Sequence, residues 1–244
     1  MNSTGDMATS RQHYSTITFD MGFTLVDLHS GYDQELVRVA AEEGLAVTLD
    51  DARAAMRRYW QDQIPRDATA TWAASSEVDA AMAFEIDQTI CLNLGLRDPR
   101  IHRAVYEFNQ RNFRDPANYQ VFPDVFATLQ TLRDRGLTLG IISNWGWYLS
   151  DLCEALALAP YFDFVISSAR VGAAKPHAAI FQAALARAGS DPACTLHVGD
   201  TLAADVLGAQ AVGITGVLLD RPGASQATGD YAVVSSLAEI PALL

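Results

Sequence analysis

The sequence predicts an α/β fold, a doubly wound parallel sheet that is Rossmann-like in its alternation of strands and helices, with a helical domain inserted into it. Two observations support this prediction. Short apolar runs recur along most of the chain with helix signals between them, whereas residues 28–117 hold helix signals only. Nearly continuous apolar runs are typical of strands buried on both faces, and strands that alternate with helices favour parallel pairing.

Six apolar runs are the expected strands, and the last of them is the weakest. They cover residues 16–19, 137–142, 164–166, 195–198, 214–219 and 231–234. Polar residues follow three of these runs: Asp20 follows the first, Ser143 the second, and Gly199 with Asp200 the fourth. Ligands of open parallel sheets bind beyond the carboxyl ends of the strands, so these residues mark the expected site.

Helices are expected between the later strands. Proline opens the stretches 123–136 and 176–189 and glycine closes both, while residues 201–212 form a third stretch that Gly213 ends. Proline near the start and glycine at the end is the usual punctuation of a helix.

The inserted segment is expected to contain four helices, over residues 32–43, 50–63, 77–94 and 99–113, with a break at residues 65–71. We therefore divide the chain into three parts. Residues 1–13 are a flexible N-terminal tail, residues 14–27 and 118–244 form the α/β core domain, and residues 28–117 form a helical cap domain.

Composition excludes several classes of protein. The chain has 244 residues, 29 of them acidic and 17 basic, with a net charge of −12 and no basic stripe. That balance argues against nucleic acids and anionic membranes as partners. No apolar run approaches the roughly 20 residues that cross a bilayer. Three scattered cysteines and the lack of a secretion signal favour a cytoplasmic location, and the chain is expected to be a monomer or a homodimer.

One basic residue differs from all the others. Sixteen of the 17 basic residues are arginine, and the single lysine is Lys175. A solvated surface charge can be either residue type, whereas a compact ammonium and a planar guanidinium are not interchangeable in a tight site. The position of Lys175 is therefore informative.

The polar residues at the strand ends form a chemically specific set. Its members are Asp20, Ser143, Asn144, Lys175, Asp200 and Asp205. Carboxylates in one pocket repel each other unless a cation joins them, and oxygen ligands suit Mg²⁺. A carboxylate can also attack phosphorus as a nucleophile, and an ammonium and a hydroxyl can then stabilise the charge on the phosphoryl oxygens.

At these residues the sequence resembles the haloacid dehalogenase superfamily, in the branch with a small α-helical (C1-type) cap. Four motifs occur in the family's order, and the helical insertion lies between the first and the second. They are Asp20-Met21-Gly22-Phe23-Thr24 after the first strand, Ser143-Asn144 after the second, Lys175-Pro176, and Gly199-Asp200 with Asp205 five residues later.

The resemblance implies a role for each residue. Asp20 would be the catalytic nucleophile, forming a phospho-aspartyl intermediate, and would also be a ligand of Mg²⁺. Asp200 and the backbone carbonyl of Gly22 would be further ligands, and Asp205 would support the metal. Ser143, Asn144 and the catalytic Lys175 would bind the phosphate group. The implied enzyme is a Mg²⁺-dependent hydrolase, a phosphatase acting on a small phosphorylated metabolite.

Position 22 departs from the family's pattern. The phosphatases of the family carry a second aspartate there, which protonates the leaving oxygen and then activates water, and Gly22 can do neither. Loss of a general acid or base costs about 10²–10⁴-fold in rate. Three interpretations stay open: a phosphatase that works without this residue, a protein with impaired turnover that binds a phosphorylated ligand or partner, or a dehalogenase-type hydrolase.

A few further residues are candidates for supporting roles. Asp27 and His29 could replace the missing acid, or could lie in a hinge. The arginines at positions 57, 58 and 66 could reach an anionic part of the substrate. His197, just before the fourth motif, is interpreted as a core residue rather than a catalyst.

Overall fold

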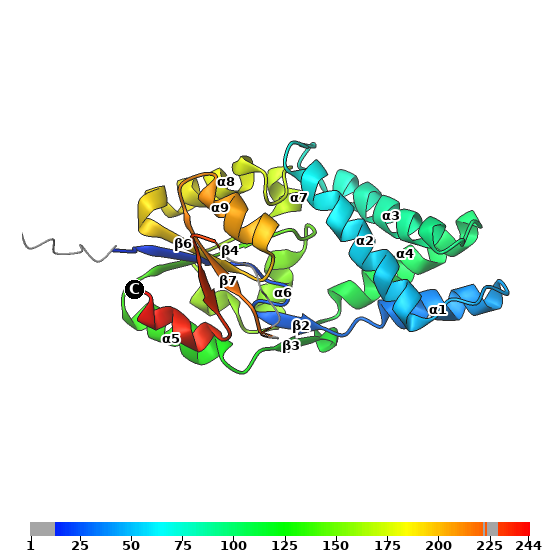
Figure 1. Ribbon diagram of the computed structural model, residues 1–244, viewed down its shortest axis with the longest axis horizontal. Coiled ribbons are helices and arrows are strands. Elements are labelled where there is room, and N and C mark those ends of the chain that lie inside the picture. Colours follow the sequence, from blue (N-terminus) through cyan, green and yellow to red (C-terminus); the bar gives the residue numbers. More distant parts are fainter. Residues whose placement is uncertain (1–12, 222, 224–228) are drawn as a thin grey trace, which may run out of the picture.

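The structure of the protein, a computed structural model, describes residues 13–221, 223 and 229–244. An α/β unit with helices on both faces of a sheet lies beside a unit of four helices (Figure 1). The tail predicted for residues 1–13 falls, apart from His13, outside the described residues.

The sheet has six parallel strands in the order β5-β4-β1-β6-β7-β8. The strands are β1 (Thr16–Phe19), β4 (Thr138–Ser143), β5 (Phe164–Ser167), β6 (Thr195–Gly199), β7 (Thr215–Leu219) and β8 (Ala232–Val234). All six expected strands are therefore present, and the doubly wound fold is confirmed. The strand order reverses beside β1, which pairs with β4 on one side and β6 on the other.

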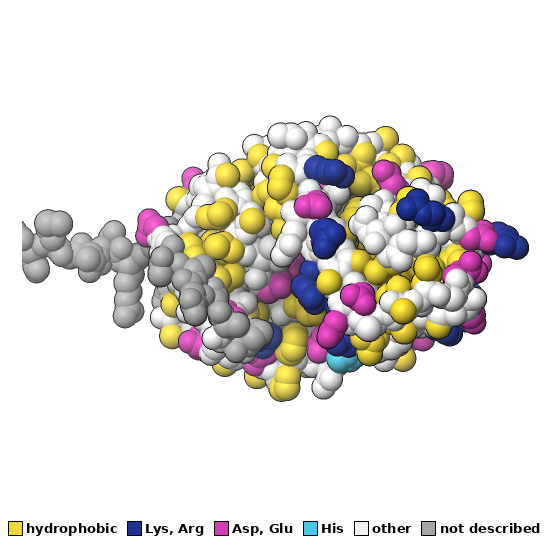
Figure 2. Space-filling view, turned by 45° about the vertical axis from the view of Figure 1, so that its right-hand side comes forward, with side chains coloured by type: hydrophobic (Ala, Val, Ile, Leu, Met, Phe, Trp, Pro, Cys, Tyr) yellow, Lys and Arg dark blue, Asp and Glu magenta, His cyan; other side chains and the backbone are white. Residues whose placement is uncertain are grey.

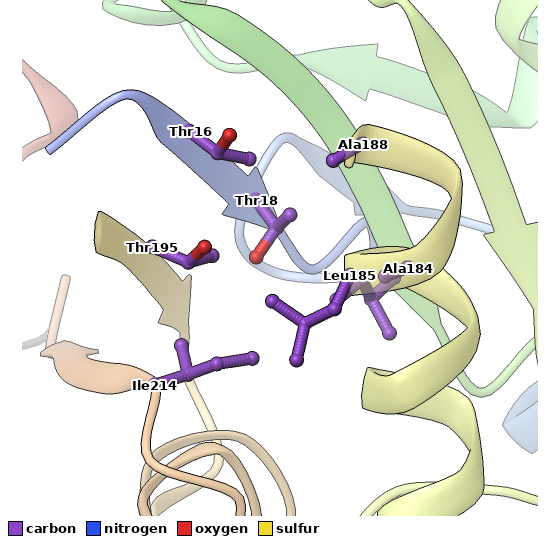
Figure 3. A pocket seen from close by; sticks show the side chains of 8 residues that line it. Thr16, Thr18, Ala184, Leu185, Ala188, Thr195 and Ile214 are labelled. Carbon is purple, nitrogen blue, oxygen red and sulfur yellow. The ribbon is translucent and has the colours of Figure 1, made fainter. Parts of the chain in front are cut away.

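Helices cover both faces of the sheet (Figure 1). One side has α5 (Val125–Asp134), α6 (Leu149–Ala155) and the 3₁₀ turn η5 (Leu237–Ala242); the other has α8 (Ala178–Ala188), the π-helical turn η4 (Leu202–Leu207) and α9 (Gly208–Gln210). Adjacent residues of β4 pack on opposite faces of the sheet. Ile141 belongs to the same hydrophobic core as Leu129 of α5, and Ile142 to the same core as Phe181 of α8. The gap between β1, β6 and α8 has no room for a water molecule (Figure 3).

The inserted segment folds into four helices with a core of their own. They are α1 (Tyr32–Glu42), α2 (Leu49–Asp67), α3 (Ser76–Asn93) and α4 (Pro99–Arg114), and Leu36, Ile90 and Val105 lie at their centre. The side chain of Thr48 caps α2 by accepting a bond from the Asp51 backbone N–H. We call this unit the cap.

Several details differ from the sequence prediction. The helix α2 continues through the expected break at Pro65 to Asp67, because an exposed proline two residues from a helix end removes a single N–H donor. The helix expected from Pro176 begins at Ala178, and His177 is its N-cap residue. The stretch 201–212 is divided between η4 and α9.

Some elements were not expected at all. Strands β2 (Val26–Leu28) and β3 (Tyr119–Val121) pair antiparallel where the chain enters and leaves the cap. The remaining short elements are α7 (Ser168–Val171), η1 (Pro116–Asn118), η2 (Ala159–Tyr161) and η3 (Pro192–Cys194). None of the described helices is long and apolar enough to cross a membrane.

Asp87 carries the most deeply buried carboxyl group of the cap, and the site does not use it. Asp87 is 1% exposed and accepts bonds on Oδ1 from the Tyr32 hydroxyl (2.7 Å) and Asn109 Nδ2 (3.0 Å). Its Oδ2 has no partner in the described part of the chain. Burial raises the pKa of Asp87 to about 6, so the folded state holds the proton more tightly than the unfolded chain does.

Replacing Asp87 by asparagine is therefore expected to stabilise the protein at pH 7.5. A folded pKa above the unfolded value gives stability that is complete below the unfolded pKa and is lost as pH rises through about 6. Asparagine keeps the acceptor oxygen and removes the buried charge, so the free energy of unfolding should rise by about 1–3 kcal/mol at pH 7.5. Urea titrations at pH 7.5 and pH 4 measure this difference.

The gain should vanish at pH 4, where the wild-type carboxyl is protonated. The exposed Asp62→Asn variant on α2 serves as the control and should change little at either pH. Equal gains at both values would mean that charge is not the cause.

Candidate active site

Three neighbouring strands bring the polar residues of the motifs to one edge of the sheet. Asp20 follows β1, Ser143 ends β4 and Asp200 follows β6, and β1 lies between the other two. The Ser143 hydroxyl donates to Asp20 Oδ1 at 2.9 Å. The parallel arrangement thus joins residues that lie far apart in the sequence.

Lys175 is the centre of this cluster. Its side chain is 2% exposed, and the ammonium donates to Asp20 Oδ1 at 2.6 Å and to Asp205 Oδ1 at 2.5 Å. Asn144 fixes the backbone at this point, because its amide donates to the Lys175 carbonyl (2.9 Å) and accepts from the Lys175 N–H (2.6 Å). The single lysine of the chain therefore lies in the predicted cluster.

The ionisation of the cluster follows from its burial and its charges. Burial alone would lower the pKa of Lys175, but the carboxylates of Asp20 and Asp205 outweigh it and raise that pKa. Burial opposes ionisation of Asp205 too, yet the Lys175 ammonium lowers the pKa of Asp205. Burial raises the pKa of Asp20, and burial together with Asp20 and Asp205 raises that of Asp200 to about 8.

The acidic residues are arranged as a divalent cation would require. Oxygens of Asp20, Asp200 and Asp205 lie within 4.8 Å of one another. When all three are ionised, one ammonium leaves two negative charges without compensation, and this repulsion adds to the effect of burial in raising the pKa of Asp200. An ion of charge +2 would balance the cluster, and an all-oxygen ligand set suits Mg²⁺.

Glycine at position 199 makes room for this cluster. A Cβ atom at Gly199 would lie 2.2 Å from Cγ of Asp205, a distance that no side chain could occupy. The Asp205 carboxylate can therefore lie directly against the end of β6, where its Oδ2 accepts a bond from the Thr201 backbone N–H at 2.9 Å.

A model of the haloacid dehalogenase-like hydrolases matches residues 14–213. The chain belongs to this family. It is 38% identical over 128 residues to bovine (Bos taurus) haloacid dehalogenase-like hydrolase domain-containing protein 3, which covers 52% of this chain and 51% of that protein. The matched region thus spans about half the length of the bovine relative.

Two longer matches agree with this assignment. A phosphoglycolate phosphatase of Caulobacter vibrioides is 30% identical over 207 residues, which are 84% of this chain and 78% of that protein. The crystal structure of a HAD phosphatase from Thermococcus onnurineus superimposes with a TM-score of 0.63 and 25% identity, over 94% of this chain and 97% of that one. The protein is therefore a hydrolase of the haloacid dehalogenase-like family.

Gly22 is the position at which the sequence departs from the expected first motif, and the structure shows what surrounds it. A Cβ at Gly22 would lie 3.3 Å from Cζ3 of Trp145, a contact tight enough that the indole would have to shift slightly. Trp145 is buried against Phe113 and Tyr119. The apolar ring of Trp145 therefore fills the space next to Gly22.

A cavity of about 350 Å³ lies beside Phe23 at the entrance to the cap, and Asp20, Ser143 and Lys175 are not among the residues that line it. Its walls include Phe23, His29 and Tyr32 together with Arg53 of α2. Phe23 has a positive φ of 55° and a side chain that is 56% exposed, a conformation that is strained for a bulky residue and is often found at functional sites. Basic and acidic side chains run down the middle of this face of the molecule (Figure 2).

The supporting candidates have different outcomes. His29 Nε2 lies 3.4 Å from Asp27 Oδ2 where β2 leads into the cap, with side chains that are 63% and 36% exposed, and His29 borders the cavity. The cavity wall contains Arg53 rather than the arginines expected from the sequence. Neither Phe23 nor Arg53 was expected from the sequence to line a cavity, although an aromatic residue inside the first motif was a signal for Phe23.

The cap contacts the core close to the site. The Trp72 N–H donates to the carbonyl of Gly172 at 2.9 Å, in the loop that leads to Lys175. Asp79 of α3 accepts a bond from the Trp147 N–H, also at 2.9 Å, shortly after Ser143 and Asn144. In this arrangement the cap covers loops that carry site residues.

Proposed function

We propose that this hydrolase is a Mg²⁺-dependent phosphatase that cleaves a small phosphorylated metabolite through a phospho-aspartyl intermediate on Asp20. The observation that carries the proposal is the buried Lys175 ammonium between Asp20 and Asp205, with the Ser143 hydroxyl on the same oxygen of Asp20. A carboxylate, an ammonium and a hydroxyl so close together can attack a phosphoryl group and bind its oxygens.

The reaction has two steps. In the first, a carboxylate oxygen of Asp20 attacks phosphorus, the ester P–O bond breaks, and the leaving oxygen takes a proton from water. In the second, water attacks the phosphorus, the bond to Asp20 breaks, and inorganic phosphate leaves with the carboxylate restored. The proton that this water gives up neutralises the hydroxide left by the first step. Lys175 and Ser143 hold the phosphoryl oxygens in both steps, and Asn144 keeps Lys175 in place.

Asp20, Asp200, the Gly22 carbonyl and, as a supporting group, Asp205 would hold the metal. When bound, Mg²⁺ would offset the negative charge of the phosphoryl oxygens. The protein's own charge could not do this, because the cluster is negative overall. The remaining part of the substrate would lie in the cavity beside Phe23, whose volume of about 350 Å³ suits a small metabolite.

The relatives support phosphate esters as the substrates. One relative is named phosphoglycolate phosphatase and a similar solved structure is called a HAD phosphatase. A panel of phosphate esters, assayed for released phosphate with Mg²⁺ and with EDTA, tests the proposal. Turnover that needs Mg²⁺ supports it, and equal rates in EDTA would contradict it.

Gly22 also favours a second candidate, a protein that binds a phosphorylated ligand with little turnover. Gly22 has no acidic side chain, and the Trp145 ring lies 3.3 Å from where a Cβ atom at this position would be. If no ester is turned over but beryllium fluoride, a phosphoryl mimic, binds together with Mg²⁺, the second candidate is the better description. Binding of neither would argue against both.

Introducing an acid at position 22 is expected to raise turnover selectively. Gly22→Asp should speed hydrolysis of alkyl phosphates by about 10–10²-fold and of aryl phosphates much less, since a poor leaving group gains most from a proton donor. Because the new Cβ would touch Trp145, the double variant with Trp145→Phe should exceed the single one. Steady-state kcat values over a series of leaving groups measure the effect.

Gly22→Asn is the matched control, since it has the same shape and cannot donate an acidic proton. It should leave the dependence on the leaving group unchanged. If the asparagine variant gains as much as the aspartate variant, or if alkyl and aryl esters gain equally, a missing proton donor is not what limits the enzyme.

A further inference from the structure

His197 lies in the middle of β6, is 0% exposed and contacts the site through a single carboxylate. We propose that His197 is a positioning residue that holds Asp205, and through it Lys175, in the working orientation. The inference rests on the proposed function for its effect on catalysis, while the hydrogen-bonded arrangement itself can be tested without turnover.

The strand register places the first partner of His197 beside it. Thr18 of β1 pairs with His197 of β6, so both side chains project from the same face, and Figure 3 shows Thr18 on the side of the sheet that faces α8. His197 Nδ1 lies 2.9 Å from the Thr18 hydroxyl. The ring edge packs against Phe181 of α8, with centroids 5.4 Å apart, which fixes its plane.

The second partner is Asp205, at 3.3 Å from His197 Nε2. A neutral imidazole has one donor and one acceptor nitrogen. A carboxylate can only accept, so Nε2 carries the hydrogen toward Asp205. Nδ1 then accepts from the Thr18 hydroxyl at 2.9 Å, a shorter contact than the one that this hydroxyl makes to the Leu196 carbonyl at 3.3 Å. The two neighbours therefore specify one tautomer and one ring orientation.

Asp205 is held on both of its oxygens by this arrangement. Oδ1 receives the bonds of His197 and Lys175, and Oδ2 receives the Thr201 backbone N–H. Rotation of the carboxylate would break at least one of these bonds. Because Lys175 divides its ammonium between Asp205 and Asp20, a misplaced Asp205 would draw Lys175 away from the nucleophile.

A second buried histidine shows how a purely structural role differs. His102 in the cap is 2% exposed, and its Nε2 lies 2.9 Å from the backbone carbonyl of Leu96. The partner of His102 is thus a backbone carbonyl within the cap. The N–H of His197 is directed instead to a carboxylate of the candidate metal cluster, where partners beyond the ligands typically change metal affinity or activity 10–100-fold.

The test compares His197→Leu with His102→Leu in the full chain. Both changes remove a buried donor, and both should lower the melting temperature. His197→Leu should also weaken Mn²⁺ binding, measured by EPR without substrate, by about 10–100-fold, and lower kcat more than it raises KM. His102→Leu should leave the Mn²⁺ dissociation constant and kcat of the folded protein unchanged.

His197→Gln places an amide N–H near the position of Nε2 and should restore most of the Mn²⁺ affinity. In wild-type protein, ¹⁵N NMR should show His197 as the Nε2–H tautomer, with a proton that exchanges faster in Asp205→Asn. The inference would be overturned if His197→Leu had the same Mn²⁺ affinity and kcat as His102→Leu. An Nδ1–H tautomer of His197 in the wild type would overturn it as well. If the wild type binds no Mn²⁺, the proposal of a metal site fails, and the tautomer of His197 alone decides whether this residue positions Asp205.

Discussion

Replacing Lys175 by methionine is expected to be the most destabilising single change in the site. The substitution keeps the length of the side chain and removes the charge, so the buried carboxylates of Asp20 and Asp205 then face each other without a cation. Removing one partner of a buried ion pair costs about 3–5 kcal/mol. Urea unfolding at pH 7.5 should show a loss of that size.

The loss should shrink as the pH falls. Lys175 lowers the pKa of Asp205, and a depressed pKa gives stability that is present above the unfolded pKa and lost as pH falls through the folded one. The wild type therefore loses this contribution in acid, while Lys175→Met never has it. Because the contribution is lost only below the ordinary pKa of an aspartate, a difference in stability that stays constant between pH 4 and pH 2 would contradict this account.

A surface arginine provides the matched control. Arg133 pairs with Asp163 at 2.6 Å, and both side chains are more than a third exposed. Arg133→Met should cost less than about 1 kcal/mol, as exposed pairs do. Lys175→Arg restores the charge but should not restore activity, because a planar guanidinium does not fit between two carboxylates that a single ammonium joins.

Much of this site could be predicted because strand ends in a parallel sheet are brought together by topology alone. Asp20 and Ser143 each follow an apolar run, and β1 and β4 are neighbours in the sheet. Lys175 was identifiable for another reason, as the one lysine among 17 basic residues. For these residues, position in the sequence pattern and position in space are closely linked.

The parts that were missed depend on contacts between distant segments. The Trp145 ring beside Gly22 and the bond from His197 to Asp205 follow from packing, and a histidine on an apolar strand looks like any core residue. Strands β2 and β3 have three residues each, too few to show alternation. Phe23 lines the cavity because of a local backbone conformation that no periodicity indicates.

Replacing Asp20 by asparagine is expected to abolish turnover while the fold persists. Asparagine keeps an oxygen that can accept from Ser143 and Lys175, so the cluster should stay assembled, but its amide cannot attack phosphorus. Loss of a nucleophile lowers kcat by roughly 10⁴-fold or more. Released phosphate measures the rate, and the mass of the acid-quenched protein shows whether wild type, and not the variant, carries a phosphoryl group.

Asp200→Asn separates the nucleophile from the metal ligands. Asp200 belongs to the acidic cluster, whereas Lys175 and Ser143 bind Asp20. Raising the Mg²⁺ concentration should therefore recover much of the activity of Asp200→Asn, because that variant has only lost affinity for the ion. The same treatment should do nothing for Asp20→Asn, since no concentration of Mg²⁺ supplies a carboxylate. If Mg²⁺ rescues both variants alike, Asp20 serves the metal only, and water attacks the phosphoryl group directly.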